Sequence, residues 1–199
     1  MKEKKLFTTV NMVKIGILSA LAFVLMRTLE IPLPIFPAFL KIDFGDIPAL
    51  IGTLVIHPAA GVVIVIIKNI LALFNSSSGG VGEIANIIVG IAYIIPIAFV
   101  TQKKVSLKNI LLGSLVSIVL MIGAGILTNA LMTMPLYGEA ACVSMGNAIN
   151  PNIVDKWTFL LYVIAPFNFI KGIILTIASI IIVKAMMPAL KQLRMRRSA

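Results

Sequence analysis

The sequence predicts an all-α membrane protein, a bundle of six transmembrane helices with both termini in the cytoplasm. Of its 199 residues, 60% are hydrophobic and 12% are charged, whereas a soluble domain is about 45–50% apolar and about 25% charged. The mean hydropathy is +1.09, and apolar stretches recur along the chain between short polar connections. Six spans of ~20 residues leave too little for an additional soluble domain, so we expect residues 1–199 to form a single integral membrane domain.

The apolar stretches place the spans at approximately 12–29, 47–56, 59–74, 84–100, 110–134 and 158–183. The first span ends where Pro32 and Pro34 stop a helix, and the loop that follows is rich in proline and aromatic residues. The second span is short, which favours a tilted or partly re-entrant segment. A tight turn at His57-Pro58 leads into the third span.

The later spans are separated by three connections of different character. Residues 75–83, NSSSGGVGE, have the composition of a flexible loop, and residues 101–109 form a basic loop after the fourth span. Residues 135–157 are the longest connection and join the fifth span to the sixth. An even number of spans places both tails on one side of the membrane.

The distribution of charge identifies the cytoplasmic side. The net charge is +10, and most basic residues lie in the two tails and in the loop 101–109: Lys2, Lys4, Lys5, Lys14, Lys103, Lys104, Lys108, Lys184, Lys191, Arg194, Arg196 and Arg197. The acidic residues other than Glu3 lie in the remaining connections or at the span ends that face them: Glu30, Asp43, Asp46, Glu83, Glu139 and Asp155. The positive-inside rule predicts this alternation, which places the tails in the cytoplasm and argues against nucleic acid as the partner.

Several classes of site are missing from the sequence. There is no G-x-x-x-x-G-K-[ST] motif, so the chain cannot cradle the phosphates of ATP by itself. Cys142, the only cysteine, cannot form an intramolecular disulfide, and no group of His, Cys, Asp or Glu has metal-binding spacing. His57 is the only histidine and suits a turn beside a proline. We therefore expect no catalytic residues, no metal site, no cofactor and no enzymatic activity.

Polar side chains at membrane depth mark the candidate binding site. An ionised side chain at the centre of a helix in lipid costs about 2.5–3.5 kcal/mol, so those that persist usually face protein, water or a ligand. The candidates are Lys68 and Asn69 in the third span, Glu83 and Asn86 at the start of the fourth, Asn129 in the fifth, and Asn168 and Lys171 in the sixth. Because the asparagines of spans four to six fall in the outward halves of their helices, we expect an outward-opening pocket there, covered by the loop 31–45.

These residues also have purely structural interpretations. Lys68 could pair with Asp43 or Asp46, which is as plausible as a ligand role. Asn86 could bond the backbone of a neighbouring helix, as asparagines in membranes do. The polar pair of the sixth span is the one that most favours a binding role.

Charged and aromatic residues near the span ends can be interpreted in two ways as well. Arg27 fits an ion pair with Glu30 or a contact with a lipid headgroup. Tyr137 and Trp157 suit the aromatic belt at the membrane interface first and a stacking platform for a ligand second.

Small residues on the first span predict a close contact between helices. Gly16 and Ala20 form a small-x-x-x-small pair, which lets another helix approach closely. Packing within the same bundle and docking of a separate partner explain the pair about equally well. Its place near the cytoplasmic end suits a partner that carries the energy source.

Four segments resemble a known family: PLPIFPAFLKIDFGDIPALIG (32–52), IKNILALFNSSSGGVGEIANIIVG (67–90), NALMTMPLYG (129–138) and PFNFIKG (166–172). The combination is similar to the substrate-binding S-component of energy-coupling factor (ECF) vitamin transporters, and within that family to the riboflavin-specific type. The resemblance spans about residues 12–185. The last segment and the first loop are fairly specific to the riboflavin type, whereas S-components for other vitamins share the small-residue pair.

The resemblance implies a six-helix bundle in a bacterial cytoplasmic membrane that captures riboflavin from outside the cell. Transport would then need a separate module of one transmembrane coupling protein and two cytoplasmic ATPases. Gly16 and Ala20 match the alanine-x-x-x-alanine pattern with which the family docks the coupling protein, with glycine in place of the first alanine.

The resemblance also assigns residues to the vitamin. Asn129, Asn168 and Lys171 would hydrogen-bond the polar edge of the isoalloxazine ring or the ribityl hydroxyls. Phe39, Leu40 and Lys41 belong to the segment 36–43 that would cover the vitamin, and Gly82, Glu83 and Asn86 would line the outer rim. Lysine at position 41 could tolerate a phosphate on the tail, so flavin mononucleotide (FMN) is a second candidate ligand.

Two other functions fit parts of the sequence. A stand-alone secondary transporter would need a proton or sodium site, and no inward acidic residue lies in mid-span. An intramembrane enzyme acting on lipid headgroups would need paired acids at one interface, and the close pair Asp43 and Asp46 lies among prolines in a loop. An S-component for another small vitamin-like solute is the alternative nearest to the resemblance.

Overall fold

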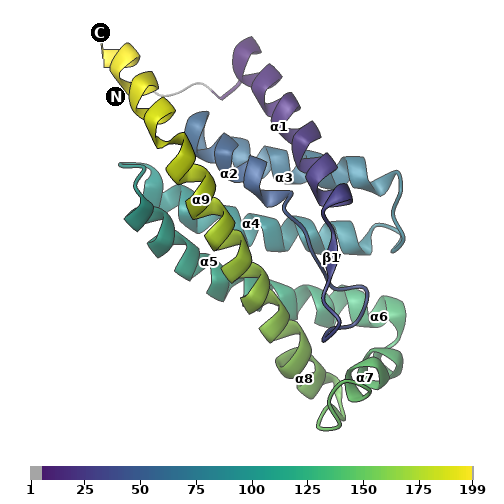
Figure 1. The fold of residues 1–199 in the computed structure, drawn as a ribbon. Coiled ribbons are helices and arrows are strands. Elements are labelled where there is room, and N and C mark those ends of the chain that lie inside the picture. Colours follow the sequence, from purple (N-terminus) through teal and green to yellow (C-terminus); the bar gives the residue numbers. More distant parts are fainter. Residues whose placement is uncertain (1–5, 199) are drawn as a thin grey trace.

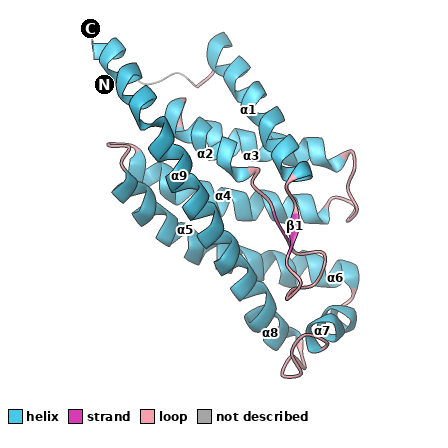
Figure 2. Cartoon of the chain, viewed as in Figure 1, coloured by secondary structure: helices cyan, strands magenta, loops and turns pink. Residues whose placement is uncertain are grey.

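The computed structural model describes residues 6–198, with side chains over residues 6–188, and is almost entirely helical (Figures 1 and 2). The predicted basic residues Lys2, Lys4 and Lys5, and the side chains of Lys191, Arg194, Arg196 and Arg197, lie outside that description. The first and last described helices, α1 and α9, begin and end at the same end of the molecule (Figure 1).

The helical elements follow the predicted spans closely. The helices are α1 (Thr9–Thr28), α2 (Asp46–Val55), α3 (Pro58–Leu73), α4 (Val81–Thr101), α5 (Leu107–Thr128), α6 (Met134–Tyr137), α7 (Glu139–Asn147), α8 (Lys156–Phe159) and α9 (Ala165–Ser198). Two π-helical turns, η1 (Asn129–Thr133) and η2 (Leu160–Ile164), join α5 to α6 and α8 to α9. Each of the six predicted spans therefore coincides with a helix or with a run of joined helices.

Helix length separates the spans into two groups. Among the described residues, four helical runs are long and apolar enough to cross a membrane: Thr9–Thr28, Val81–Thr101, Leu107–Tyr137 and Lys156–Pro188. Helix α2 has 10 residues and α3 has 16. At 1.5 Å per residue α2 is about 15 Å long, half the ~30 Å of a bilayer core. Its shortness was expected from the sequence, and it packs against α1, α3, α4 and α9.

Two connections contain more structure than the sequence predicts. The fifth span was expected to end at 134 and to be followed by a long loop, but the helix continues to Tyr137 and α7 follows. Gly138, at φ 86°, makes the bend between α6 and α7, a conformation that favours glycine. In the first loop, β1 (Ile31–Pro32) pairs antiparallel with β2 (Lys41–Ile42). This short ribbon folds residues 31–42 back on themselves as a compact cover, and we call residues 31–42 the cover segment.

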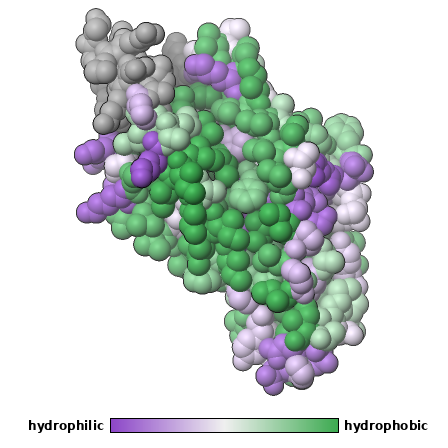
Figure 3. All heavy atoms as spheres, viewed as in Figure 1, coloured by the Kyte–Doolittle hydropathy of each residue, from purple (hydrophilic) through white to green (hydrophobic). Residues whose placement is uncertain are grey.

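The core lies between the helices, and the outer surface is apolar. One buried cluster joins α1, α2, α3, α4 and α9, and a second lies beneath the cover segment, around Phe159 and Phe167. Large apolar side chains such as Ile17, Val119 and Ile181 are exposed on α1, α5 and α9. They form a broad hydrophobic region with hydrophilic residues toward the two ends (Figure 3). This is the surface that a lipid bilayer solvates.

Candidate functional site

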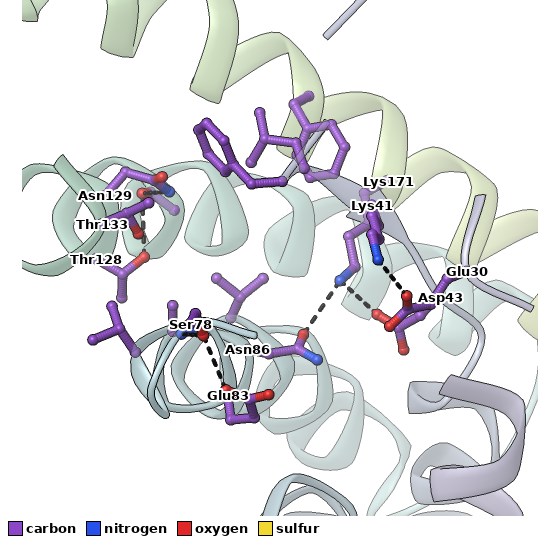
Figure 4. A pocket seen from close by; sticks show the side chains of 18 of the residues that line it. Glu30, Lys41, Asp43, Ser78, Glu83, Asn86, Thr128, Asn129, Thr133 and Lys171 are labelled. Carbon is purple, nitrogen blue, oxygen red and sulfur yellow. Dashed lines mark hydrogen bonds and ion pairs between the residues drawn. The ribbon is translucent and has the colours of Figure 1, made fainter. Parts of the chain in front are cut away.

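A cavity of about 460 Å³ lies beneath the cover segment, between α1, α4, α5, η1 and α9. The residues that the sequence assigned to the vitamin all line it: Phe39, Leu40, Lys41, Gly82, Glu83, Asn86, Asn129, Asn168 and Lys171. Figure 4 shows several of them facing one another across the space. Residues from separated parts of the chain thus meet in one pocket of a size typical for small molecules, about 300–1,000 Å³.

The two π-helical turns lie beside this cavity and contact each other. Each ends two residues before a proline, η1 before Pro135 and η2 before Pro166. A proline lacks the N–H that a helix needs and its ring clashes with the carbonyl four residues earlier, so the wider π turn accommodates it. Asn129 is the first residue of η1, and Asn168 lies on α9, four residues after the end of η2.

The two asparagines are fixed in the same way. The Asn129 Nδ2 donates to the Gly125 carbonyl at 2.8 Å, and the Asn168 Nδ2 donates to the Ile164 carbonyl at 2.9 Å. Asn129 is 7% exposed, and its Oδ1 has no hydrogen-bond partner among the described residues. A buried, unpartnered acceptor costs free energy, so this oxygen is available to a donor in the cavity.

Lys171 belongs to a buried cluster of four charges. Its Nζ lies 3.0 Å from Asp43 Oδ2, and Lys68 lies 3.4 Å from Asp43 and 2.7 Å from Asp46. Burial opposes ionisation of Asp43, but the ammonium groups of Lys171 and Lys68 hold the pKa of that carboxyl well below its ordinary value. Lys68 therefore pairs with both acids, as one interpretation of the sequence predicted, and it does not line the cavity.

The residues of α4 at the rim of the cavity make different hydrogen bonds. Asn86 Oδ1 accepts a hydrogen bond from Lys171 Nζ at 3.3 Å, so it bonds a side chain of α9 rather than a neighbouring backbone. Glu83 accepts hydrogen bonds from the hydroxyls of Ser76 and Ser78, at 2.7 and 3.1 Å. These bonds order the loop 75–83, which the composition had suggested to be flexible. Gly82 donates its N–H to Ser78 Oγ at 2.8 Å, and a Cβ at this position would lie 2.8 Å from the same oxygen.

The cover segment is tied to the bundle by one ion pair and two aromatic contacts. Lys41 Nζ lies 2.7 Å from Glu30 Oε2, and Arg27 Nη1 lies 3.9 Å from the other carboxylate oxygen, Glu30 Oε1. Phe39 stacks on Tyr137 with ring centroids 5.3 Å apart. A second contact, Phe36 edge-on to Phe167 at 5.4 Å, holds the base of the segment. Arg27 thus pairs with Glu30, as one of its two interpretations predicted.

Sequence reasoning missed three kinds of residue at the site. It did not connect Asp43 with Lys171, whereas Asp43 forms an ion pair with Lys171 and lines the cavity. Thr128 and Thr133, which flank Asn129 at the cavity, were not considered. Tyr137 was assigned first to the membrane interface, but it lines the cavity and stacks on the cover. Its place one turn beyond Thr133 on a helix that continues through Pro135 is the signal that could have found it.

The small-residue pair of α1 faces outward. Gly16 and Ala20 are both exposed, and a Cβ added at Gly16 would meet nothing within 4 Å. Within the described residues, the pair is therefore not used for close packing inside the bundle. Its outward face leaves it accessible to another helix.

Comparison with known proteins places this architecture in a family. Residues 10–183 match the family described as ECF transporter, substrate-specific component. A solved structure of the S component of a bacterial ECF transporter aligns with a TM-score of 0.72 and 29% identity, covering 90% of this chain and 96% of that one.

Curated relatives cover nearly the whole chain. The riboflavin transporter FmnP of Bacillus subtilis (strain 168) is 35% identical over 197 residues, 98% of this chain and 97% of that protein. The riboflavin transporter RibU of Staphylococcus aureus (strain TCH60) is 30% identical over 184 residues, 92% and 93% of the two chains. The lipid-headgroup enzyme considered from the sequence is therefore excluded. The chain belongs to the family of ECF transporter substrate-specific components, which are multi-pass proteins of the bacterial membrane.

Proposed function

We propose that this chain captures riboflavin from outside the cell and presents it to a separate ATP-driven coupling module. The observation that carries the proposal is the cavity beneath the cover segment, where the buried amides of Asn129 and Asn168 and the buried ammonium of Lys171 converge on a space lined also by apolar, hydroxyl and paired charged side chains. Relatives that align over nearly the whole chain are riboflavin transporters, which supports the choice of ligand.

The chemistry of the cavity matches a flavin. The isoalloxazine ring is a flat tricycle whose faces and benzenoid end are apolar and whose other edge carries an imide N–H between two carbonyls, together with ring nitrogens that accept hydrogen bonds. The free Oδ1 of Asn129 can accept from that N–H or from a ribityl hydroxyl. The Lys171 ammonium can donate to a carbonyl, and the rings of Phe39 and Tyr137 offer apolar surface to the tricycle.

The first test is the absorbance spectrum of detergent-purified protein expressed without added ligand. We expect flavin bands in the visible blue, and denaturation should release riboflavin for identification. A colourless protein that also fails to quench the fluorescence of added riboflavin would refute the ligand assignment, and other vitamin-like solutes would be screened instead.

A matched pair of substitutions tests the site itself. Asn69 resembles Asn129 closely, because it is buried, donates its Nδ2 to the carbonyl four residues earlier at 2.8 Å, and has an unpartnered Oδ1. It does not line the cavity. Asn129→Ala should therefore weaken riboflavin binding about tenfold or more, since the affected bond is buried, while Asn69→Ala should leave affinity unchanged. Equal losses in the two variants would contradict the site.

The topology and partners complete the proposal. The chain forms a single membrane domain in which α2 and α3 complete six crossings and both termini lie in the cytoplasm, supported by the common end of α1 and α9 (Figure 1). A coupling protein docks on the exposed pair Gly16 and Ala20 of α1, and two cytoplasmic ATPases supply the energy. Reporter fusions at each terminus test the orientation, and an external reporter signal would contradict it.

FMN binding stays a separate prediction. The Lys41 ammonium already has Glu30 as its partner at 2.7 Å, so a phosphate would have to compete with that carboxylate. Lys41→Ala should lower the affinity for FMN more than the affinity for riboflavin. An unchanged ratio of the two affinities would show that Lys41 does not recognise phosphate.

A further inference from the structure

Two of the three donors of the Lys171 ammonium are already engaged. An ammonium group has three N–H donors. One faces Asp43 Oδ2 at 3.0 Å and another faces Asn86 Oδ1 at 3.3 Å, and the side chains of Lys171 and Asp43 are each 6% exposed. Because Lys171 also lines the cavity, the third donor is the one left for a ligand (Figure 4).

We infer that Asp43 is a positioning residue for ligand recognition: it orients Lys171 so that the remaining N–H faces the cavity. The inference rests on the proposed function, because it concerns how the same pocket holds riboflavin. A lysine side chain has four rotatable bonds and a compact charge. Without a fixed acceptor its donor would have no set direction.

Asp43 can orient Lys171 because further contacts fix the carboxylate of Asp43 itself. Its Oδ1 accepts the Gly45 N–H at 3.0 Å and faces Lys68 Nζ at 3.4 Å. Lys68 in turn donates to Asp46 at 2.7 Å. A Cβ at Gly45 would lie 2.8 Å from the Ala22 carbonyl and 3.0 Å from Lys68 Nζ, so this close approach leaves no room for a side chain at position 45. The two lysines and two aspartates together carry no net charge.

The position of Asp43 in the chain adds a consequence. It directly follows β2, the end of the cover segment, whereas Lys171 is 128 residues away on α9. Lys171 therefore has its oriented donor only when the base of the cover is seated against α9. Ligand recognition and the placement of the cover depend on the same ion pair.

A double-mutant cycle tests whether Asp43 acts through Lys171. Riboflavin is titrated by fluorescence quenching against the wild type, Asp43→Asn, Lys171→Met and the double variant. We expect each single substitution to weaken binding about tenfold to a hundredfold, and the double variant to bind no more weakly than Lys171→Met. The double variant leaves Lys68 and Asp46 as a balanced pair, so its folding is the least disturbed.

Asp46→Asn is the matched control. It removes one buried carboxylate from the same cluster by the same change, but Asp46 neither touches Lys171 nor lines the cavity. Its melting temperature should fall while its riboflavin affinity stays within about threefold of the wild type. If Asp46→Asn loses as much affinity as Asp43→Asn, charge imbalance explains the effect and the inference is wrong.

The remaining outcomes are also decisive. If the fold-losses in riboflavin affinity of Asp43→Asn and Lys171→Met multiply in the double variant, the two residues act independently. That result would overturn the inference and leave the proposed function intact. A wild type that binds no riboflavin would overturn both. If Asp43→Asn yields little folded protein, Asp43→Ala with Lys68→Met keeps the cluster neutral and still removes the acceptor for Lys171. That variant should bind as weakly as Lys171→Met, and wild-type affinity would refute the positioning role.

Discussion

Gly125 is where the packing of α5 against α9 determines the position of a pocket side chain. A Cβ built at Gly125 would lie 2.2 Å from Asn168 Nδ2 and 2.7 Å from its Cγ. Ordinary van der Waals contact begins near 3.4 Å, so in Gly125→Ala the Asn168 amide must retreat by roughly 1 Å. Asn168 is 4% exposed and bonded to the Ile164 carbonyl, so the retreat breaks that bond or moves the helix.

Two opposing contributions set the change in the free energy of unfolding of Gly125→Ala. Overpacking a buried site costs about 1–3 kcal/mol, and replacing glycine by alanine within a helix returns up to about 1 kcal/mol. We expect a net destabilisation of about 1 kcal/mol. The complex with riboflavin loses a buried hydrogen bond worth about 1–1.5 kcal/mol, so the dissociation constant should rise roughly tenfold.

Gly123 supplies the control. It lies on the same helix two residues earlier, is exposed, and a Cβ there would meet nothing within 4 Å. Both alanine variants are compared with the wild type by riboflavin fluorescence quenching and by thermal unfolding in the same detergent. Gly123→Ala should match the wild type in affinity and be equally or slightly more stable. If Gly125→Ala binds riboflavin as tightly as Gly123→Ala does, the position of Asn168 does not matter for riboflavin binding and the reasoning is refuted.

Three other substitutions test separate parts of the molecule. The pKa of Asp43 is lowered in the folded protein, so the stabilisation from its ionised form is complete above the ordinary value of 3.8 and is lost as the pH falls below it. Melting temperatures measured from about pH 8 to pH 3 should therefore fall at the acid end in the wild type, and they should fall less in Asp43→Asn. Tyr137→Ala removes the stack on Phe39 and should speed riboflavin release several-fold to about tenfold in stopped-flow measurements, whereas Tyr137→Phe should not. Gly16→Leu should block ATP-driven uptake in cells that contain the coupling module while leaving riboflavin binding by the purified subunit unchanged; uptake at the wild-type rate would exclude this face of α1 as the docking site.

The sequence was informative where the physical signal is local. Apolar runs of span length and their proline or polar ends predicted the six spans to within a few residues, because burial in lipid demands continuous helix; the exception is the end of the sixth, expected at 183, where α9 continues to Ser198. Asparagine and lysine at membrane depth identified the polar wall of the cavity, because such residues are costly unless they face a partner. The loop 31–45 was expected to cover the pocket before any resemblance was considered, and the resemblance to the family assigned the vitamin to residues 36–43 within it.

The parts that were missed depend on contacts between distant residues. The ion pair of Lys171 with Asp43 joins positions 128 residues apart, and no local pattern reports it. The π turns arise from Pro135 and Pro166 in helices that continue past them. The fifth span was expected to end just before Pro135, whereas a wider turn lets the helix go on and brings Tyr137 to the cavity; Pro166 was placed inside the sixth span, but the wider turn before it was not predicted.

The buried charge cluster is difficult to explain by stability alone. Four charged groups removed from water pay a desolvation penalty that their mutual attraction barely returns, and well-packed apolar residues of similar volume are often as stabilising or more so. Losing one partner, by contrast, costs about 3–5 kcal/mol because a lone charge is left behind. The cluster therefore makes most sense at a binding wall: a fixed cationic donor can bond a flavin carbonyl strongly, and a membrane-embedded site can hold one only if its charge is balanced nearby. Lys171 is that donor and Asp43 balances its charge, with Lys68 and Asp46 as a second neutral pair beside them.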